Sequence, residues 1–344
     1  MTTSRPGIAE LKPDQTVDLL LLVRRKNLAR SRNGKDYLNL KLGDRSGEIT
    51  AFVWDDAERL AALFDEGDCV RVKGRSQLFN GNLQLTVNLI EPWRGEIDPR
   101  DFLPQSQQHI PTMERDLHGM IADLCDPWLK RLVEAFFIRD REFARRFALA
   151  PAAKAMHHAW LGGLLEHTLG VARLARKICP LYPGIDADLV LAGALLHDIG
   201  KIEELVYERT LDYSTAGRLL GHVMLGVQMI REKAGTIKGF PEETLMLVEH
   251  LILSHHGEYA FGSPKRPKTR EAIVLNFIDD LDAKLVAVDT FMAKAAREGR
   301  EWSDYHRLFE RNFYLGGRQE RPEDSLPVSD SDAPASGGRS GLLF

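Results

Sequence analysis

Cysteine is scarce in this sequence, and the three cysteines lie far apart. Cys69, Cys125 and Cys179 form no Cys-x-x-Cys pair. A disulfide framework and a cysteine-based zinc site both need cysteines at short, repeated spacings, so neither fits this chain. A reducing compartment suits such a composition, and we expect a cytoplasmic protein.

Long apolar runs are missing as well. The first residues contain no signal-peptide core, and the longest early apolar run, residues 19–23, is far too short to cross a bilayer. The sequence therefore predicts no membrane segment. Lys and Arg number 46 against 50 Asp and Glu, and the net charge of -4 argues against bulk attraction to polyanions. Local basic patches still allow the chain to bind nucleic acid.

After a short leader, the sequence has the pattern of a small β-barrel. Strands are expected at residues 17–23, 36–42, 48–54, 69–78 and 83–90. The last two are joined through Asn80-Gly81-Asn82, and an Asn-Gly between two strand patterns favours a tight hairpin. A short helix is expected at residues 56–64. Five strands with a helix between the third and the fourth indicate the OB-fold, a partly open barrel.

A cluster of cations lies between the first two expected strands. It consists of Arg24, Arg25, Lys26, Arg30, Arg32 and Lys35. The segment that follows, residues 37–49, resembles OB-folds of the tRNA-anticodon-binding type. In an OB-fold this loop borders the face that carries single-stranded nucleic acid, where cations follow the phosphates and aromatic rings stack on the bases. The candidate rings are Tyr37, Phe52, Trp54 and Phe79. The alternative is a solvated basic loop above rings that fill the barrel.

The rest of the chain changes from strand-like to helical patterns. At 344 residues, two domains fit. We predict an α+β protein: an OB-fold nucleic-acid-binding domain at 1–93, a Pro- and Gln-containing linker at 94–112, an all-α domain at 113–315 and a disordered tail at 316–344.

An apolar run in the helical half, residues 187–196, ends in His197-Asp198. A buried carboxylate without a partner is costly, so this pair must be met by opposite charge, hydrogen bonds or a metal ion. Taken alone, the pair also fits a helix C-terminus with a capping histidine and a solvated aspartate. Further members of the series favour a metal: they are His167, His222, His255 and Asp279.

Imidazole and carboxylate groups are ligands that divalent Mn, Fe, Co and Zn accept. Two ions bridged by one carboxylate can polarise a phosphoryl group, lower the pKa of water and stabilise the attacking and leaving oxygens of a displacement. The composition of the series therefore suggests hydrolysis of phosphoesters.

The series resembles the ligand pattern of the HD-domain metal-dependent phosphohydrolases. An OB-fold followed by such a domain resembles the YhaM family of 3′-5′ exoribonucleases, over nearly the whole chain except the tail. Further matching motifs are His157-His158, Gly162-Gly163, Leu196-His197-Asp198-Ile199-Gly200-Lys201, Ser254-His255-His256-Gly257 and Leu281-Asp282-Ala283-Lys284.

The resemblance implies a site residue by residue. The first metal would be held by His167, His197, Asp198 and Asp279. Asp198 would bridge to a second ion, held also by His222 and His255. Lys201 and His256 would hold the scissile phosphate, and Lys154 and His158 would lie at the pocket rim. The implied ion is Mn²⁺, with Fe, Co or Zn as alternatives. The implied substrate is single-stranded RNA, with single-stranded DNA also to be tested, and the product is a nucleoside 5′-monophosphate. Apolar helix faces leave a homo-oligomer open.

Two points depart from this pattern. On a helical wheel the main apolar stripe runs through residues 274, 277, 278, 281, 285 and 288, and Asp279 lies nearly opposite it, whereas Asp282 lies nearer its edge. Only the family spacing, three residues before Asp-Ala-Lys, selects Asp279. The triplet Asn276-Phe277-Ile278 also stands where relatives suggest a His-Tyr-Ala-like sequence.

Two other functions stay open. One is a phosphodiesterase or nucleotidase that acts on small nucleotides, for which an extended cationic segment has no purpose. The other is a non-catalytic nucleic-acid-binding regulator, against which the complete ligand set argues.

Overall fold

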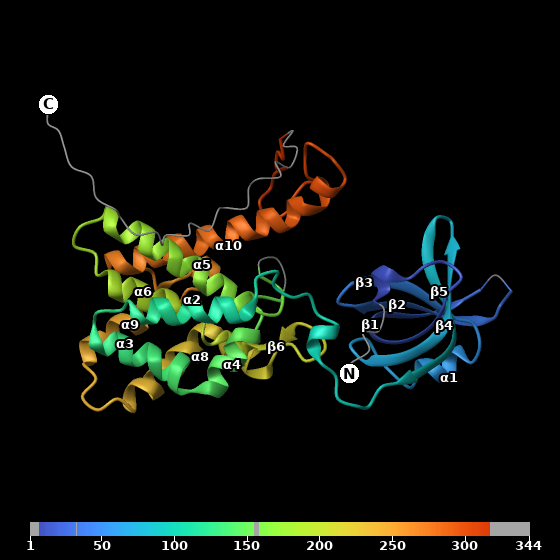
Figure 1. Ribbon diagram of the computed structural model, residues 1–344, viewed down its shortest axis with the longest axis horizontal. Helices are drawn as coiled ribbons and strands as arrows, with labels where there is room; N and C mark the ends of the chain where they lie inside the picture. The colour runs from blue at the N-terminus through green and yellow to red at the C-terminus, as the bar shows by residue number, and fades with distance from the viewer. Residues whose placement is uncertain (1–6, 32, 155–157, 317–344) are drawn as a thin grey trace, which may run out of the picture. The chain divides into compact units, whose positions relative to one another are not determined.

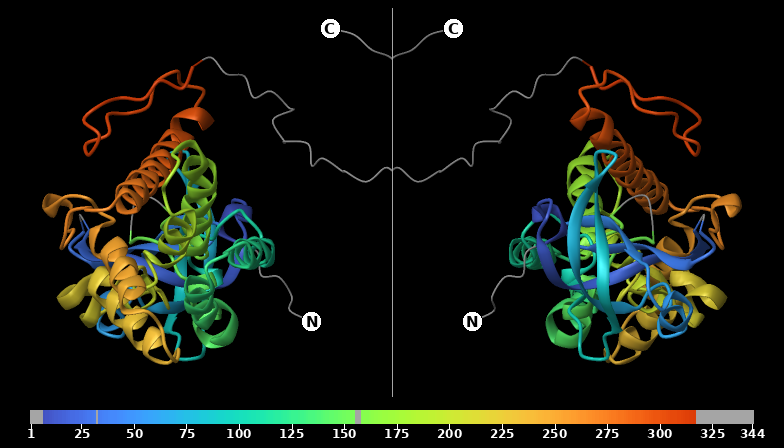
Figure 2. Two further views of the ribbon diagram at one scale, coloured as in Figure 1. Left: turned by 90° about the vertical axis from the view of Figure 1, so that its left-hand side faces the viewer. Right: turned by 90° about the vertical axis from the view of Figure 1, so that its right-hand side faces the viewer.

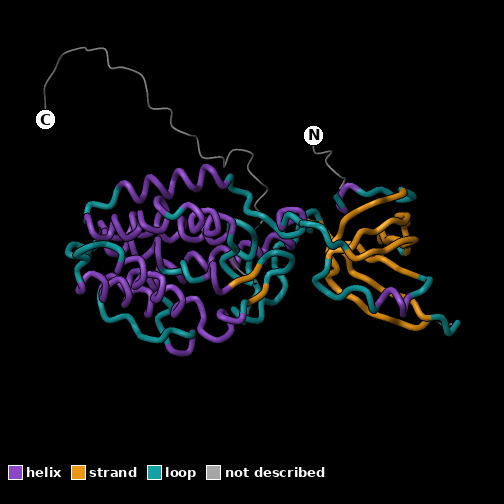
Figure 3. The backbone as a smooth tube through the Cα atoms, turned by 90° about the horizontal axis from the view of Figure 1, so that it is seen from below, coloured by secondary structure: helices purple, strands orange, loops and turns teal. Residues whose placement is uncertain are grey.

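The computed structural model describes residues 7–31, 33–154 and 158–316 (Figure 1). The chain divides into two compact units, residues 1–287 and 288–344, and each is described by itself. Strands gather in the N-terminal part and helices make up most of the remainder (Figure 3). The predicted α+β class, an OB-type barrel followed by a helical domain, is confirmed.

The N-terminal domain is a closed barrel with the strand order β1-β2-β3-β5-β4, drawn in blue to cyan in Figures 1 and 2. Its elements are η1 (Ile8–Glu10), β1 (Thr16–Arg30), β2 (Asp36–Asp44), β3 (Gly47–Val53), α1 (Ala57–Ala61), β4 (Cys69–Phe79) and β5 (Asn82–Pro92). Strands β3 and β5 pair in parallel, and the other neighbours are antiparallel. Period-two alternation sends residues such as Leu38 and Leu40 inward, where they are fully buried. In the β4–β5 hairpin, Asn80 and Gly81 have φ values of 48° and 79°, as a two-residue type I′ turn requires.

Strand β1 is much longer than the sequence pattern predicts. It ends at Arg30 instead of Val23, so four of the six predicted loop cations, Arg24, Arg25, Lys26 and Arg30, lie on a strand. After an irregularity at residues 23–25, this part of β1 pairs only with β2. Most of its side chains are exposed or half-buried on both faces, so no apolar alternation marks it in the sequence. Arg32 lies outside the described residues.

The segment that follows the barrel, residues 94–109, contains the turn η2 (Pro99–Asp101). Phe102, which is 1% exposed, packs with Leu22 and Cys69 at the end of the barrel. The predicted linker is therefore partly anchored to the barrel by an apolar side chain.

The helices surround α6, the buried run of the sequence analysis. They are α2 (Ile110–Ala122), α3 (Pro127–Glu134), α4 (Arg141–Leu149), α5 (Gly163–Ile178), α6 (Ala187–Leu196), α7 (Lys201–Glu204), α8 (Thr215–Gly235), α9 (Glu242–Ser254) and α10 (Arg270–Arg297). Shorter turns are the π-helical η3 (Ala135–Arg139), η4 (Cys179–Leu181) and η5 (Tyr259–Phe261). Every residue of α6 from Leu189 to Leu196 is buried, and α6 packs against α3, α5 and α9. The carboxylate of Asp186 caps α6 by accepting the Leu189 N–H.

Two details differ from a purely helical domain. A small antiparallel pair, β6 (Leu205–Val206) and β7 (Asp212–Tyr213), lies between α7 and α8. Two-residue strands are too short to produce a periodic signal. Residues 288–316 continue α10 and then form short backbone pairings such as Trp302 with Tyr314.

No helix in the part of the chain that the structure describes is long and apolar enough to cross a membrane.

Candidate metal centre

The first group of candidate ligands is buried where α5, the end of α6 and α10 meet. His167 Nε2 lies 3.1 Å from Asp279 Oδ1 and 3.2 Å from His197 Nε2. The three side chains offer ligand atoms within 4.8 Å of one another. Asp198 follows directly, and its Oδ2 lies 3.2 Å from His197 Nε2. The structure therefore brings together all four residues predicted for the first metal.

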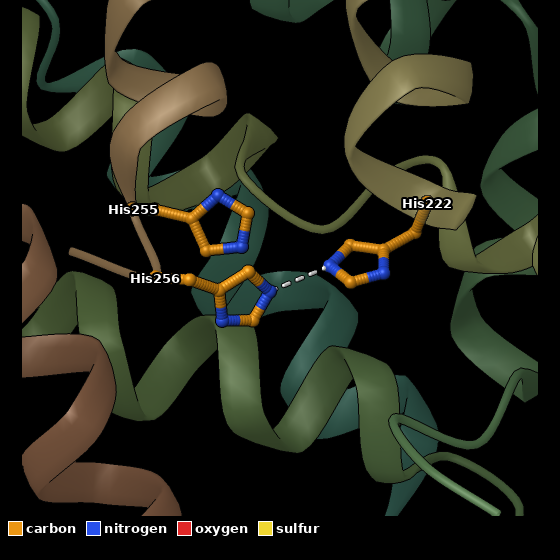
Figure 4. A group of neighbouring side chains, drawn as sticks. All are labelled: His222, His255 and His256. Atoms are coloured by element: carbon orange, nitrogen blue, oxygen red, sulfur yellow. Dashed lines mark hydrogen bonds between the residues drawn. The ribbon is translucent and has the colours of Figure 1, made fainter. Parts of the chain in front are cut away.

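The second group lies at the other oxygen of Asp198. His222 from α8 and His255 from the end of α9 place their Nε2 atoms 3.5 Å and 3.8 Å from Asp198 Oδ1. His256 joins them, and its Nε2 lies 3.0 Å from His222 Nε2 (Figure 4). His222, His255 and His256 also form a group whose ligand atoms lie within 4.8 Å. Each oxygen of Asp198 thus faces a different group of histidines.

Contacts on the far side of the rings fix which nitrogen points inward. His197 Nδ1 donates to Ala194 O at 2.9 Å, and His255 Nδ1 donates to Ile252 O at 2.6 Å. A neutral imidazole that donates from Nδ1 carries a lone pair at Nε2. The Nε2 atoms of both rings therefore face the centre as potential ligands, which is the arrangement that outer partners impose in metal sites.

His222 is held in the same way by the segment before it. Its Nδ1 lies 3.1 Å from Glu204 Oε1, and the same oxygen accepts the His222 backbone N–H. Helix α8 is interrupted at Gly221, whose φ of 72° and ψ of 159° lie in a region that almost only glycine adopts. This kink lets both the backbone and the ring of His222 meet Glu204.

Two buried atoms in the centre support a divalent cation. Asp198 Oδ1 and His255 Nε2 are buried and have no hydrogen-bond partner among the described residues. Buried polar atoms normally have such a partner, and a carboxylate facing several imidazole nitrogens is the donor set that first-row divalent ions accept. The residues present therefore fit the ion that the ligand series implies.

Electrostatics keep His255, His256 and Asp198 in the forms that bind metal. Burial lowers the pKa of His255 well below its usual value, and burial together with His222 lowers the pKa of His256 to about 4. Both imidazoles are therefore neutral near pH 7. Burial by itself would raise the pKa of Asp198, but Lys201 and His197 hold it well below 3.8, so Asp198 is ionised.

Lys201 was predicted to contact the phosphate, and the structure also gives it a partner. Its Nζ lies 2.6 Å from Asp198 Oδ2, and only 7% of the residue is exposed. Burial would lower the pKa of Lys201, but Asp198 raises it, so the ammonium is charged. Lys201, Asp198, His255, His256 and Asp279 all line one hollow of about 680 Å³, so the metal centre opens into a space that can receive a substrate.

On the barrel, the predicted aromatic rings gather on the outer face. Tyr37 and Trp54 stack with centroids 4.8 Å apart, and Phe52 lies 5.8 Å from Trp54. The inward positions beside them are filled by Leu38, Ala51 and Val53. The alternative that these rings fill the barrel is therefore wrong. Phe79 lies apart from them at the end of β4 and is 60% exposed.

The predicted cations differ in whether their charged groups are bonded within the barrel or lie at the surface where nucleic acid could contact them. Lys26 Nζ donates to the carbonyls of Ala61 and Phe64 and pairs with Asp65. Arg24 Nη2 donates to Phe102 O at 2.7 Å. These contacts stabilise the barrel and its α1 segment. Lys35 pairs with the exposed Asp55, and Arg30 lies 3.7 Å from Asp36, so both lie at the solvent surface.

Arg25 is exposed, and its neighbour across the β1–β2 ladder is Lys41, a second cation. Lys41 is not among the cations predicted from the sequence. Both line a hollow of about 540 Å³ on the barrel with Asn27 and Asn39. Strand alternation could have found Lys41, because it lies two and four positions from Asn39 and Tyr37 on the same face.

Comparisons with known proteins agree with both halves of the structure. The family described as an OB-fold nucleic acid binding domain matches residues 22–93, and the HD domain family matches residues 164–284. The proteins named 3′-5′ exoribonuclease YhaM from Bacillus pumilus and Bacillus subtilis are each 33% identical over 310 residues, which is 90% of this chain and 97% of theirs. The YhaM protein of Bacillus licheniformis is 33% identical over 311 residues with the same coverage. This chain belongs to the YhaM family.

Three aspartates of this YhaM-family chain lie close together on α10 and have different environments. Asp279 is 9% exposed and faces His167 Nε2. Asp280 is exposed and pairs with Lys284 at 2.6 Å. Asp282 Oδ2 lies 2.7 Å from Nδ1 of His167, on the side away from Asp279. Asp279 therefore faces the centre, and Asp282 orients His167 from behind. The sequence analysis missed this orienting role, although the spacing of three residues from Asp279 places both on one helix face.

The two residues predicted at the pocket rim lie elsewhere. His158 is 2% exposed and its Nε2 lies 3.2 Å from Asp282 Oδ2, so it is behind His167 and not at an opening. Lys154 pairs with Asp212 at 2.9 Å and lies over the Tyr213 ring. Neither side chain lines the hollow at the metal centre. The motif residue His157 lies outside the described residues.

The unexpected Asn276 has a defined contact. Its Nδ2 donates to His255 O at 2.6 Å, which ties α10 to the turn that carries His255 and His256. The departure from the family pattern therefore provides a polar contact near the centre and removes no proposed ligand.

Proposed function

We propose that this protein is a metal-dependent 3′-5′ exoribonuclease that hydrolyses phosphodiester bonds at the 3′ end of single-stranded RNA and releases nucleoside 5′-monophosphates. The observation that carries the proposal is the position of Asp198, whose two oxygens face two separate groups of histidines. The named activity of the YhaM relatives supports the same reaction. Single-stranded DNA is a second substrate to test.

Two divalent ions would be bound, with Mn²⁺ as the first candidate and Fe, Co and Zn as alternatives. His167, His197, Asp198 and Asp279 would hold one ion. Asp198, His222 and His255 would hold the other, and we add His256 to this second set because its Nε2 lies beside that of His222. Bound ions of this kind activate water and neutralise charge on the phosphoryl oxygens.

The protein's own groups orient this chemistry. Asp282 and Glu204 fix the rings of His167 and His222, and Lys201 holds the carboxylate of Asp198 in place. The Lys201 ammonium lines the hollow, so it also supplies positive charge toward a phosphate. His256 can approach the same phosphate if it is not used as a ligand. The outer face of the barrel would carry the RNA upstream of its 3′ end.

A cleavage assay tests the proposal and separates it from the two alternatives. Single-stranded RNA labelled at its 5′ end should shorten stepwise with Mn²⁺, whereas RNA labelled at its 3′ end should release a labelled mononucleotide at once. Cleavage of small nucleotides alone would favour a phosphodiesterase or nucleotidase. Binding of RNA with no cleavage under any of the four metals would favour a regulator.

Stacking on the barrel can be tested through Trp54. Trp54→Ala should weaken RNA binding about 10-fold, because an aromatic ring stacked on a base contributes on the order of 1–3 kcal/mol. Fluorescence anisotropy with labelled single-stranded RNA measures the change. Tyr182→Ala is the control, since Tyr182 is similarly exposed at 54% but lies in the helical domain. Equal affinities for Trp54→Ala and wild type would move the RNA path away from this face.

The cations on β1 should separate into two kinds. Arg25→Gln should lower the dependence of RNA affinity on salt by about 0.7 in the log–log slope, the effect of one phosphate contact on a single strand. Lys26→Gln should leave the slope unchanged and lower the free energy of unfolding by about 1 kcal/mol or more, because its ammonium donates to two carbonyls. Anisotropy titrations at several salt concentrations and urea unfolding measure both effects. A reduced slope in Lys26→Gln alone would reverse this assignment.

A cytoplasmic location and self-association remain predictions. Helix α10 exposes Leu281 and Leu285, at 42% and 55%, and light scattering of the purified chain would determine its oligomeric state.

A further inference from the structure

The hollow at the metal centre carries two aromatic rings that the proposed ligands and phosphate contacts do not explain. Phe261 on η5 is 73% exposed, and Phe277 on α10 is 68% exposed. Both line the same hollow as Asp198 and His256. Exposed apolar rings beside buried ionised groups indicate a binding site for a ligand with an apolar part next to a charged part.

The position of Phe277 on α10 shows how the hollow is arranged. Residues two positions apart on a helix lie about 200° apart around its axis. Asp279, 9% exposed, therefore belongs to the buried floor, whereas Phe277 belongs to the outer edge. Asn276 and Asp280 line the space between them. A ligand that spans the hollow would meet ionised groups at one end and an aromatic ring at the other.

The segment that carries Phe261 is held in place by its own contacts. Ser263 Oγ donates to Lys265 O at 2.6 Å, and Lys265 N donates to Leu253 O at 3.1 Å. Arg266 pairs with Glu258 at 2.7 Å, and its guanidinium lies 5.0 Å over the Tyr259 ring. The ring of Phe261 is thus presented on an ordered turn, which reduces the entropy lost when it binds a ligand.

The cations at the edge of the hollow already have partners. Arg266 pairs with Glu258, and Lys284 pairs with Asp280. Additional binding energy at this edge must therefore come mainly from the rings. Stacking suits an enzyme that has to accept every base in turn, since each base offers a π-face.

We propose that Phe261 and Phe277 stack on the 3′-terminal nucleobase and so hold the last nucleotide with its phosphodiester at the metal centre. This inference rests on the proposed exoribonuclease function. It assigns a base-binding subsite to the helical domain, separate from the rings on the barrel. It also predicts that the enzyme distinguishes a terminal nucleotide with a base from one without a base.

The test compares RNA that ends in a normal nucleotide with RNA that ends in an abasic ribose. Wild-type enzyme should remove the abasic residue about 10-fold more slowly in kcat/KM, since the stacking contact is missing. Phe261→Ala and Phe277→Ala should each lower kcat/KM for normal RNA and leave the abasic rate unchanged, so that the ratio of the two rates falls toward one. Phe261→Trp and Phe277→Trp should restore the ratio. Variants that keep the wild-type ratio would overturn the proposal.

Leu285→Ala is the matched control. Leu285 is an exposed apolar residue two helical turns beyond Phe277, and it does not line the hollow. It should keep the wild-type ratio. If Leu285→Ala and Phe277→Ala both lose the discrimination and both change the mass of the protein in light scattering, this helix face is a subunit interface and the proposal is wrong.

A binding measurement makes the result independent of catalysis. RNA that ends in 2-aminopurine, with no metal added, should lose fluorescence on binding the wild-type protein, because stacking quenches this base. The quench should be smaller with Phe261→Ala and Phe277→Ala and unchanged with Leu285→Ala. Absence of RNA cleavage by wild type would refute the proposed function, whereas an equal quench in all the variants would refute the stacking subsite.

Discussion

Asp198→Ala is expected to reduce RNA hydrolysis by at least about 10³-fold while RNA binding is largely retained. Asp198 is the only side chain of the described centre whose two oxygens face both groups of histidines, so its loss affects both proposed ions. Loss of several kcal/mol of transition-state stabilisation corresponds to an effect of this size. Gel assays with labelled RNA and Mn²⁺ measure the rate, and anisotropy measures the binding.

The variant also removes the partner of a buried cation. Lys201 would be left without the carboxylate 2.6 Å away, and an unpaired buried charge is strongly destabilising. Asp198→Asn keeps the shape of the side chain and should lose activity equally, with circular dichroism to confirm the fold. Asp140→Ala is the control, because Asp140 also pairs with a lysine at 2.6 Å, Lys233, but belongs to neither group of ligands. Activity retained by both Asp198 variants would refute the two-metal mechanism.

Much of the fold could be predicted from the sequence because the signals are local. Alternating residues and an Asn-Gly turn marked the barrel, and the apolar run of α6 marked the buried helix that ends at His197. The histidines could be predicted as ligands because together they resemble the HD-domain series, whereas one histidine alone is more often a core or surface residue. What brings their Nε2 atoms together, such as Glu204 behind His222, depends on contacts between distant segments.

For helix α10, the helical wheel predicts the wrong buried face. The stripe that the sequence analysis took as the main apolar face includes Phe277, Leu281 and Leu285, and all three are exposed. The buried face contains Ala272, Leu275, Ile278 and Asp279, of which only Ile278 belongs to that stripe. The small Ala272 and the carboxylate of Asp279 reduce the apparent hydrophobicity of this face, so the wheel placed Asp279 away from the core. Only the family spacing selected the residue that the structure places beside His167.

The cationic segment shows a second limit. Charge alone grouped six residues in one loop, but the structure distributes the described five among contacts of different kinds. Arg24 and Lys26 donate to backbone carbonyls, whereas Arg25 stays exposed beside Lys41. A sequence records the charge of a lysine, and only the fold determines whether its ammonium has already found acceptors.

Substitutions of the three aspartates on α10 should separate their roles. Asp279→Ala should lower the bound metal measured by inductively coupled plasma mass spectrometry, because its carboxylate faces His167 Nε2 at 3.1 Å. Asp282→Asn should weaken metal affinity about 10–100-fold, the usual effect of removing an outer partner of a ligand histidine. Asp280→Ala should change neither, since the exposed Asp280 carboxylate pairs with the exposed Lys284 and belongs to neither group of proposed ligands. Titration with Mn²⁺ followed by calorimetry measures the affinities.

The response of each variant to added Mn²⁺ distinguishes a ligand from a residue that orients a ligand. A ligand and its orienting residue both reduce activity, so rates alone do not distinguish them. Excess Mn²⁺ should restore much of the activity of Asp282→Asn, because all the proposed ligands remain and only the orientation of His167 is lost. The same addition should fail for Asp279→Ala. Metal loss in Asp280→Ala with full occupancy in Asp279→Ala would show that the helix is rotated from the position described, and would shift the assignment of its ligand by one residue.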